Sequence, residues 1–469
     1  MKVIVKNEII VTEPTESLVA YCKKHLVISN PDYAKLQRLG KWTGNTPSKL
    51  YLYHIDGDTY YLPYGIKDEL IKKGLIDLNE IEYGHRHPFV NIKSYIIKPI
   101  ALYDYQEEAV NACLAKKFGI LQSPAGSGKT QMGLALIQKY GCKTLWLTHT
   151  KDLLTQSKTR AAQYFDKSSF GEITNGKVNI GKSITFATVQ TLAKQDMSIY
   201  ADSFDMVIVD ECHRVAGTPT TVTQFGKVIS SLNAMHKFGL SATVHRADGL
   251  IKTTFAYLGD IAYQVPDEAV ADKIMQVWIN RRDTGIKIHP DCLDTDGTII
   301  YQKLITYLTN NTKRNFLIAN DLINNSKHYN LILSDRIEHL KEIMEMLPED
   351  MCVMIDGTMT SKKGKAQREK ALDDMRAGKK RYLFATYKLA KEGLDIPRLD
   401  RLYLATPQKD YAVVVQSVGR IARTFEGKAE PICYDYVDNI GYTVKAFKRR
   451  LSHYRKCNCL LVGGTNDNN

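Results

Sequence analysis

The chain lacks any apolar run that approaches the roughly 20 residues a membrane-spanning helix needs. Its first ten residues, MKVIVKNEII, carry charge but no continuous apolar core and no small-residue cleavage site, so they do not predict a secretory signal. Because 44% of the residues are hydrophobic and 25% are charged, the composition is that of a globular protein. We therefore expect a soluble protein without membrane segments.

Paired cysteines are also missing. The nine cysteines are scattered, their number is odd and none forms a C-x-x-C pair. Cys457 and Cys459 lie too close in sequence to form half of a zinc site by themselves, and no second pair exists. We expect reduced thiols in a cytoplasmic protein and no metal site built from cysteine.

Acidic residues are in the minority: 51 of them face 64 lysines and arginines, which gives a net charge of +13. This excess favours a polyanionic partner such as nucleic acid, because Lys and Arg release counterions from phosphates. A basic protein without such a partner has the same composition, so charge alone does not decide. The length of 469 residues predicts about three domains.

Residues 1–100 predict a small α+β accessory domain, which is a candidate for DNA binding. They contain nine of the 27 tyrosines and no phosphate-loop signature. The segments 49–55 and 59–63 flank Asp56-Gly57-Asp58, a pattern of two strands joined by a tight turn.

From residue 101 onward, short apolar runs alternate with helical patterns, as a parallel α/β sheet requires. Residues 101–264 form the first such unit, and 265–310 interrupt the alternation as a linker with structure of its own. A second unit follows at 311–440, where Asp335 and Glu338 suggest a capped helix. Strands are expected at 118–122, 144–148, 184–187, 206–209 and 237–240 in the first unit, and at 330–333, 381–385 and 399–405 in the second.

The tail, residues 441–469, predicts a basic amphipathic helix. Its apolar face contains Val444, Phe447, Leu451 and Tyr454. The basic residues around that face are Lys445, Lys448, Arg449, Arg450, Arg455 and Lys456.

Residues 123–130 have the sequence Ser-Pro-Ala-Gly-Ser-Gly-Lys-Thr and lie between a predicted strand and a predicted helix. The two glycines let the backbone curl so that its N–H groups face a phosphate at the positive end of the helix. Lys129 would reach the β- and γ-phosphates, and the Thr130 hydroxyl would bind Mg²⁺. The strict pattern begins with glycine, where this chain has Ser123. The predicted ATP-binding residues are Ser123, Pro124, Ala125, Gly126, Ser127, Gly128, Lys129 and Thr130.

The apolar run 206–209 ends in Asp210-Glu211-Cys212-His213. Two adjacent carboxylates at the end of a buried strand cost solvation energy unless a cation or a proton-transfer task keeps them there. We predict that Asp210 binds Mg²⁺ through water. Glu211 would orient and deprotonate the attacking water.

With these motifs, the chain resembles the superfamily 2 helicases over about residues 100 to 440. The resemblance also rests on Tyr105-Gln106 and on the segments 148–152, 187–191, 241–243, 385–386 with 392–395, and 416–423. It implies two tandem RecA-like lobes that use ATP and Mg²⁺. It implies adenine contacts at Tyr103 and Gln106, although the family usually has arginine where Tyr103 stands. It further implies an ATP contact at Asp395 and residues that couple hydrolysis to lobe movement: His213, Ser241, Thr243 and Gln416.

Arg420 and Arg423 are three residues apart, so they share a face of a helix or turn. Two guanidinium groups suit the charge that spreads over the γ-phosphate in the transition state. They lie in the second predicted lobe, far in sequence from Lys129. Hydrolysis would therefore require the two lobes to close.

Within the superfamily, the segments 240–250 and 255–260 resemble the XPB- and UvsW-type DNA helicases, which include phage enzymes that remodel branched DNA. Arg246-Ala247-Asp248 lies where XPB-like enzymes have an Arg-Glu-Asp element implicated in strand separation, and Ala247 departs from it. The D-E-A-D sequence typical of RNA helicases is absent. The resemblance implies the cytoplasm of a bacterium or of a phage-infected host, and movement from 3′ to 5′.

The resemblance implies DNA as the partner, in single-stranded, duplex or branched form. In such motors the strand crosses both lobes and is held by its backbone, so we expect little sequence specificity. The segment 362–381 is basic and is either a duplex contact or a solvated helix. Tyr60, Tyr61 and Tyr64 are more typical of a core than of a stacking surface. The predicted nucleic-acid contacts are Thr148, Lys151, Thr188, Gln190, Arg246 and Thr386.

Three alternatives remain at this point. The first is a duplex translocase that does not separate strands, and the second is an RNA helicase. The third is a nucleotide-switched scaffold with negligible turnover. Glu211, Arg420 and Arg423 argue against the scaffold, because a pure switch does not need the base and both arginines.

Overall fold

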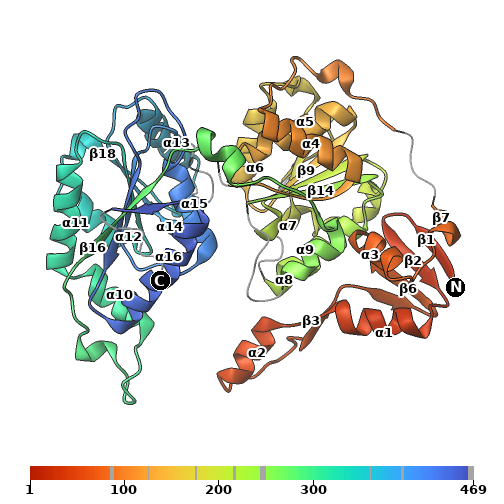
Figure 1. The fold of residues 1–469 in the computed structure, drawn as a ribbon, viewed down its shortest axis with the longest axis horizontal. Coiled ribbons are helices and arrows are strands. Elements are labelled where there is room, and N and C mark those ends of the chain that lie inside the picture. The colour runs from red at the N-terminus through yellow and green to blue at the C-terminus, as the bar shows by residue number, and fades with distance from the viewer. Residues whose placement is uncertain are drawn as a thin grey trace. The chain divides into compact units, whose positions relative to one another are not determined.

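The computed structural model describes residues 1–84, 89–124, 126–174, 177–214, 218–242, 250–359, 361–391, 394 and 396–462. The chain divides into two compact units (Figure 1). Met1–Pro124 and Gly128–Ala269 form the first, and Val270–Asn469 form the second. Among the described residues, no helix is both long and apolar enough to cross a membrane.

The N-terminal part of the first unit is a five-stranded sheet with the order β5-β6-β2-β1-β7. The predicted tight turn is confirmed, since β5 and β6 pair antiparallel around Gly57, which has a φ of 55°. The first predicted strand, 49–55, is wrong in its extent, because Lys49–Tyr51 pairs elsewhere. The elements are β1 Lys2–Val5, β2 Glu8–Thr12, α1 Glu16–His25, β5 His54–Asp56, β6 Thr59–Pro63, α3 Lys67–Lys72 and β7 Ile81–Tyr83.

A two-stranded ribbon leaves this sheet and carries a short helix at its far end (Figure 1). The ribbon consists of β3 (Val27–Ser29) and β4 (Lys49–Tyr51), which pair antiparallel. Between them lie α2 (Pro31–Arg38) and a loop that returns to β4. We call residues 30–50 the arm.

The first lobe contains an eight-stranded sheet with the order β11-β10-β12-β9-β13-β14-β8-β15. All neighbours are parallel except β10 and β11. All five predicted strands are confirmed. They could be recognised because a strand buried on both faces appears in the sequence as a continuous apolar run. The strands are β8 Phe118–Gln122, β9 Thr144–Thr148, β10 Gly171–Thr174, β11 Lys177–Asn179, β12 Ile184–Thr188, β13 Met206–Asp210, β14 His236–Ser241 and β15 Ile261–Gln264. The helices are α4 Asp104–Lys116, α5 Lys129–Tyr140, α6 Lys151–Ala161, α7 Val189–Leu192, α8 Pro219–Ser230 and α9 Ile251–Leu258.

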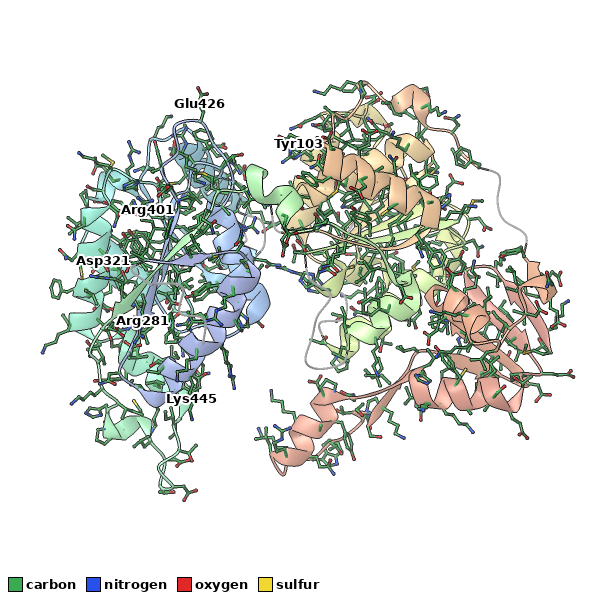
Figure 2. The ribbon with its side chains drawn as sticks, viewed as in Figure 1. Tyr103, Arg281, Asp321, Arg401, Glu426 and Lys445 are labelled. Carbon is green, nitrogen blue, oxygen red and sulfur yellow. The ribbon has the colours of Figure 1, made fainter. Side chains whose placement is uncertain are left out.

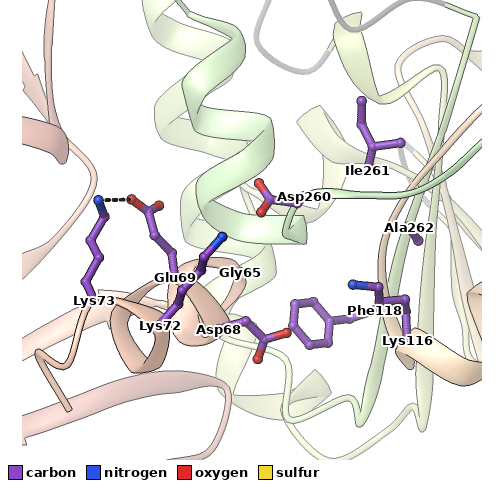
Figure 3. Close-up of a pocket in the computed structure, with 10 residues that line it drawn as sticks. All are labelled: Gly65, Asp68, Glu69, Lys72, Lys73, Lys116, Phe118, Asp260, Ile261 and Ala262. Carbon is purple, nitrogen blue, oxygen red and sulfur yellow. Dashed lines mark ion pairs between the residues drawn. The ribbon is translucent and has the colours of Figure 1, made fainter.

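The N-terminal sheet and the first lobe share one apolar core, which runs from Val3 to Leu258. Tyr64 is buried and packs edge-on against Phe118 at 5.3 Å between ring centroids, so it belongs to this core. Lys237 of β14 donates from Nζ to the carbonyl of Asn7 at 3.1 Å. Beside this junction is a cavity of about 540 Å³ (Figure 3). Its lining mixes both charges: Asp68, Glu69, Lys72, Lys73, Lys116 and Asp260.

The second unit contains a seven-stranded sheet in which all neighbours are parallel, with the order β18-β19-β17-β20-β21-β16-β22. The three predicted strands are confirmed. The segment 265–310, expected as a linker, contributes β16 and α10 to this unit. The strands are β16 Trp278–Asp283, β17 Asn330–Ser334, β18 Cys352–Ile355, β19 Tyr382–Thr386, β20 Arg401–Leu404, β21 Ile432–Val437 and β22 Leu460–Leu461. The helices are α10 Tyr301–Thr309, α11 Thr312–Asn324, α12 Ile337–Met344, α13 Lys362–Arg376, α14 Tyr387–Lys391, α15 Tyr411–Ile421 and α16 Gly441–Lys456.

The predicted cap by Asp335 and Glu338 is wrong. Helix α12 begins after Arg336, whose side chain makes no capping bond. The backbone N–H of Arg336 instead donates to Ser334 Oγ at 3.1 Å, and that of Asp335 donates to Thr406 Oγ1 at 3.0 Å. Side chains at the end of β17 and in a neighbouring loop therefore accept the hydrogen bonds from the backbone N–H groups that precede α12.

Buried ion pairs hold the second sheet to its helices. Figure 2 shows the positions of Asp321 and Arg401 in this unit. Arg314 of α11 is fully buried and donates from Nε to Asp438 Oδ1 at 2.9 Å. Arg282 of β16 forms two hydrogen bonds to the carboxylate of Asp321, at 2.8 and 2.9 Å. The charges of Arg314, Asp438 and Asp321 can be buried because each has an opposite partner at hydrogen-bonding distance, and the Arg282 side chain is partly exposed.

Helix α16 confirms the predicted amphipathic tail, with Phe447 and Tyr454 in the core. One residue of the predicted basic surface, Arg450, is not on the surface. The guanidinium of Arg450 is buried and forms two hydrogen bonds to the carboxylate of Asp435 on β21, at 2.7 and 2.8 Å. The Tyr454 hydroxyl donates to the same carboxylate at 2.6 Å. Arg450 therefore fixes the tail helix to the sheet and does not reach solvent.

Replacement of Arg450 by methionine should destabilise the second unit by about 3–5 kcal/mol, because it leaves the Asp435 carboxylate buried without its partner. Native-state hydrogen exchange of the β21 amides measures the effect. The matched control is Arg449→Met, one residue earlier and exposed, which should change stability by no more than about 0.5 kcal/mol. Equal effects of the two changes would contradict a structural role for the buried pair.

Candidate nucleotide-binding and motor site

The predicted phosphate loop connects β8 to α5 at the carboxyl edge of the first sheet. Gly126 and Gly128 have φ angles of 88° and 84°, a left-handed conformation that residues with a side chain rarely adopt. Lys129 begins α5, and its Nζ lies across the loop, 3.4 Å from the Ser123 carbonyl and 3.3 Å from that of Pro124. An ammonium group and the N-terminus of a helix thus meet where a phosphate would bind. Ala125 lies outside the described residues.

Gln106 on α4 lies directly beside this loop. A Cβ atom added to Gly128 would be only 2.5 Å from the Gln106 side-chain nitrogen, so a side chain at this position would displace the Gln106 amide. The Gln106 amide is buried; its oxygen accepts from the backbone of Tyr103 at 3.1 Å, and its nitrogen donates to the Tyr105 hydroxyl at 3.3 Å. Tyr103 is half exposed and its ring is stacked on Tyr105, with 5.9 Å between centroids (Figure 2). The fold therefore brings both predicted adenine contacts next to the phosphate loop.

The predicted acidic pair lies at the end of β13, on the same edge. The Asp210 carboxylate is buried and accepts from Ser157 Oγ at 3.2 Å. Burial, the largest cause, and the negative charge of Glu211 together raise the pKa of Asp210 to about 7, against the opposing effect of the positive charge of Lys129. A carboxylate in such surroundings is stabilised by a nearby cation.

The residues present fit a magnesium ion that takes part of its ligands from the nucleotide. Within the described part of the chain, no group of three or more His, Cys, Asp or Glu could hold a metal. Mg²⁺ bound to a nucleotide usually needs only one or two protein ligands besides phosphate oxygens and water. Asp210 and the hydroxyl of Thr130 are of this kind.

Glu211 leaves the strand in an unusual backbone conformation, with a φ of 50°. For a residue with a side chain, this costs roughly 1–3 kcal/mol and persists only where the surrounding structure imposes it. Its Oε2 lies 3.4 Å from His213 Nδ1. The same nitrogen lies 2.9 Å from the Ser241 hydroxyl at the end of β14. The turn thus directs the Glu211 side chain toward a fixed imidazole.

Ser241 connects the two halves of this site. Its strand, β14, lies between β13 and β8 in the sheet. Its hydroxyl contacts His213, and its carbonyl accepts from the backbone N–H of Ser123 at 2.9 Å. A continuous path of contacts therefore runs from Glu211 to the first residue of the phosphate loop. Thr243, the other predicted coupling residue here, lies outside the described residues.

The predicted nucleic-acid contacts of the first lobe differ in their exposure. Thr148 is fully buried and its hydroxyl donates to the Thr150 carbonyl at 3.0 Å, whereas Lys151 is exposed at the start of α6. The Gln190 amide lies 2.7 Å from His149 Nδ1, and the Thr188 hydroxyl lies 2.8 Å from that of Thr191. Burial lowers the pKa of His149, and the charge of Arg214 adds to this, so the ring is neutral at pH 7. Arg246 lies outside the described residues.

In the second unit, Arg420 lies in the last turn of α15 and Arg423 follows the end of that helix. The Arg420 guanidinium donates to the carbonyls of Ala390 and Leu394, both at 3.1 Å, and so joins α15 to the end of α14 and the segment after it. Arg423 and Gln416 are partly exposed. Thr386 is partly exposed at the end of β19, and Asp395 lies outside the described residues.

The sequence analysis did not identify Lys428. Its Nζ donates to three backbone carbonyls, those of Ile421 and Arg423 at 2.7 Å and that of Pro397 at 2.9 Å. One ammonium thus fixes the turn that follows α15 and contains Arg423. No sequence signal marks it, because a single lysine in a loop is ordinarily solvated.

Two family models match the chain, and together they cover more than half of it. One, described as the type III restriction enzyme res subunit, matches residues 99–246. The other, the helicase conserved C-terminal domain, matches residues 310–425. The chain therefore belongs to the superfamily 2 helicases, which are nucleic-acid-dependent ATPases with RecA-like lobes.

Several relatives align with most of the chain. The ATP-dependent DNA helicase uvsW of Enterobacteria phage T4 is 26% identical over 91% of this chain and 88% of its own length. The DNA 3′-5′ translocase XPB2 of Sulfurisphaera tokodaii is 27% identical over 73% of this chain and 82% of its own. A protein of Acanthamoeba polyphaga mimivirus, named as an ATP-dependent RNA helicase, is 29% identical over 72% of this chain; the match spans 63% of that relative.

Solved structures agree on the fold. Dbp5 of S. cerevisiae, bound to RNA and ADP BeF3, has a TM-score of 0.54 at 15% identity, covering 78% of this chain and 89% of its own. The type ISP restriction-modification enzyme LlaBIII bound to DNA also has a TM-score of 0.54, at 17% identity, over 76% of this chain and 30% of its own.

Lys428→Met should lower kcat for ATP by about tenfold to a hundredfold, because a displacement of about 1 Å in a catalytic constellation costs rate on this scale. Burial, the largest cause, and the charge of Arg423 lower the pKa of Lys428 to about 7, against the opposing effect of the charge of Asp400. The side chain therefore loses its charge as the pH rises through about 7, and the neutral amine has only two protons for its three carbonyl acceptors. A pH profile of the ATPase rate should show a fall on the alkaline side.

Lys428→Arg separates positioning from general folding, since a guanidinium stays charged throughout this range. Its profile should lack the fall near pH 7. The control is Lys379→Met, which removes an exposed lysine of the same unit and should leave kcat unchanged. An alkaline limb that persists in Lys428→Arg would contradict the role of this lysine.

Proposed function

We propose that this protein is an ATP-dependent DNA helicase that remodels branched DNA, such as forks and recombination intermediates. The observation that carries the proposal is the alignment over 91% of the chain with a relative named as a DNA helicase. The relative named as a DNA translocase supports the same nucleic acid. A phage-type helicase of this kind would act in the cytoplasm of the infected host.

In this proposal the phosphate loop and Lys129 hold the β- and γ-phosphates of ATP. Gln106 and Tyr103 contact the adenine, one by hydrogen bonds and the other by its exposed ring. Thr130 and Asp210 hold Mg²⁺, which would neutralise charge that develops on the phosphates.

Glu211 acts as the base that orients and deprotonates the attacking water. Its contact with His213, and its own left-handed backbone conformation, support a fixed orientation of the carboxylate. Arg420 and Arg423 of the second lobe stabilise the transition state, and Asp395 contributes to the same site.

Coupling to movement follows from the contacts of Ser241. A shift of the phosphate loop on hydrolysis reaches His213 and Glu211 through this residue, with Thr243 and Gln416 as further coupling residues. Closure of the lobes around ATP, and their separation after product release, would move the chain along a strand. That strand would be held at its sugar-phosphate backbone, without reading of its sequence, by the side chains of Lys151, Thr188, Gln190, Arg246 and Thr386.

RNA is the second candidate substrate. A relative named as an RNA helicase and a similar structure bound to RNA give it specific support. A duplex translocase that does not separate strands remains the third candidate, in keeping with the relative named as a translocase.

The first experiment is the ATPase rate against a panel of no nucleic acid, single-stranded DNA, duplex DNA, forked and four-way DNA, and RNA. Branched DNA should stimulate the rate most. Glu211→Gln should reduce the stimulated rate by about 10²-fold or more, because general-base catalysis contributes about 10²–10⁴-fold. Lys129→Ala should abolish it.

Each other outcome has a definite meaning. Stimulation by RNA alone would transfer the proposal to an RNA helicase. Strong stimulation by plain duplex, with no strand displacement from a labelled fork, would favour the translocase. A rate near zero across the whole panel would contradict the motor itself.

A further inference from the structure

The arm, residues 30–50, is fixed at its base. Asn30 is buried; its side chain accepts from the backbone of Asp32 at 3.0 Å and donates to the carbonyl of Pro47 at 2.7 Å. Its own N–H donates to the Ser48 carbonyl at 3.0 Å. Beyond the ribbon, the Tyr257 hydroxyl of α9 donates to the Leu52 carbonyl at 3.4 Å. Hydrogen bonds therefore join the two ends of the arm to each other, and the ribbon to the first lobe.

Beyond the base, the arm has no core. No side chain from Pro31 to Lys49 is buried, so α2 has no buried face. Trp42 is 88% exposed, and Leu39 is 56% exposed. The Trp42 ring lies over Gly44, where an added Cβ would be 3.0 Å from the ring. An indole held in solvent on a glycine turn contributes little to folding and is available to a partner.

The charge of the arm has one predominant sign. Lys35, Arg38, Lys41 and Lys49 are exposed, and Asp32 is the single acidic residue among them. None of these four cations forms an ion pair with another residue that the structure describes. Lysine is depleted at the centres of protein–protein interfaces, and two exposed apolar side chains make too small a patch for one. An aromatic ring among cations is instead the composition of surfaces that bind nucleic acid.

We propose that the arm binds DNA, with Trp42 stacked on a base and the four basic residues on the flanking phosphates. This inference rests on the proposed function, since it assumes a DNA substrate. A base inside an intact duplex offers no free face, so Trp42 selects places where a base is unstacked, as at a fork or junction. The arm would then recognise the structure of the DNA and not its sequence.

Fluorescence gives a direct test, because the chain has three tryptophans. Trp146 is fully buried, so in a Trp278→Phe background the solvent-accessible emission comes from Trp42. Forked and single-stranded DNA should quench this emission and protect it from iodide, and plain duplex should do so less. Absence of quenching at DNA concentrations that saturate binding, as measured with labelled DNA, would overturn the proposal. Protection that requires only a higher protein concentration, without DNA, would also overturn it by pointing to a second copy of the chain.

Affinity measurements separate the ring from the charges. Trp42→Ala should weaken binding to forked DNA by about 5- to 150-fold, the range expected for loss of one stacked base, and Trp42→Tyr should restore most of it. Replacement of both Lys35 and Arg38 by alanine should reduce the slope of log K against log salt by about 1.4–1.8. The matched control is the alanine pair at Lys23 and Lys24, exposed on α1 of the same domain, which should leave the slope unchanged. Equal effects of both pairs would show attraction by net charge alone and contradict the proposal.

Failure of the arm and failure of the proposed function give different results. If DNA stimulates the ATPase but Trp42 is neither quenched nor protected, the arm inference is wrong and the helicase proposal stands. If RNA alone stimulates the ATPase and also protects Trp42, the proposed function is wrong, and the arm binds nucleic acid of the other kind. None of these variants changes the nucleotide site, so the rate without nucleic acid should be the same in all of them.

Discussion

The contacts of Ser241 hold the candidate site of the first lobe together. The residue ends β14, the strand that separates β13 from β8, so its two polar groups reach the loops on both sides. The hydroxyl fixes His213, and the carbonyl fixes the backbone of Ser123. Strand β14 separates the acidic pair, which follows β13, from the phosphate loop, which follows β8. Ser241 gives each of them an uncharged hydrogen-bonding partner. The parallel order of the sheet thus determines the spacing between the groups that would bind phosphate and those that would activate water.

The two units use polar groups differently. In the first, the buried carboxylate of Asp210 has Lys129 as its charged neighbour, and burial and Glu211 raise its pKa. In the second, the buried carboxylates Asp435 and Asp438 have arginine partners in direct contact. Buried carboxylates in direct contact with arginine are structural, whereas a strongly raised pKa at the end of a strand is typical of a functional site.

Much of the fold followed from the sequence because strands buried on both faces leave apolar runs, as 118–122 and 206–209 do. The phosphate loop and the acidic pair followed for the same reason, since each lies directly after such a run. The role of Arg450 did not follow, because its partner Asp435 lies on another strand and a basic residue on an amphipathic helix ordinarily faces water. Lys428 is similar: its three acceptors are backbone carbonyls, which leave no mark in a sequence. The segment 278–283 was assigned to a linker because only Trp278 and Ile279 are apolar and four polar residues follow them, which does not indicate an internal strand.

The shared core of the first unit has a mechanical consequence. Residues from Val3 to Ile76 and from Ile120 to Leu258 pack in one apolar cluster, so the N-terminal sheet has no hinge of its own against the first lobe. The arm is attached to that sheet through the buried Leu50 and Leu52. The first lobe therefore carries the base of the arm with it as one stiff, packed body, and any bending is confined to residues 31–49, which have no buried side chain.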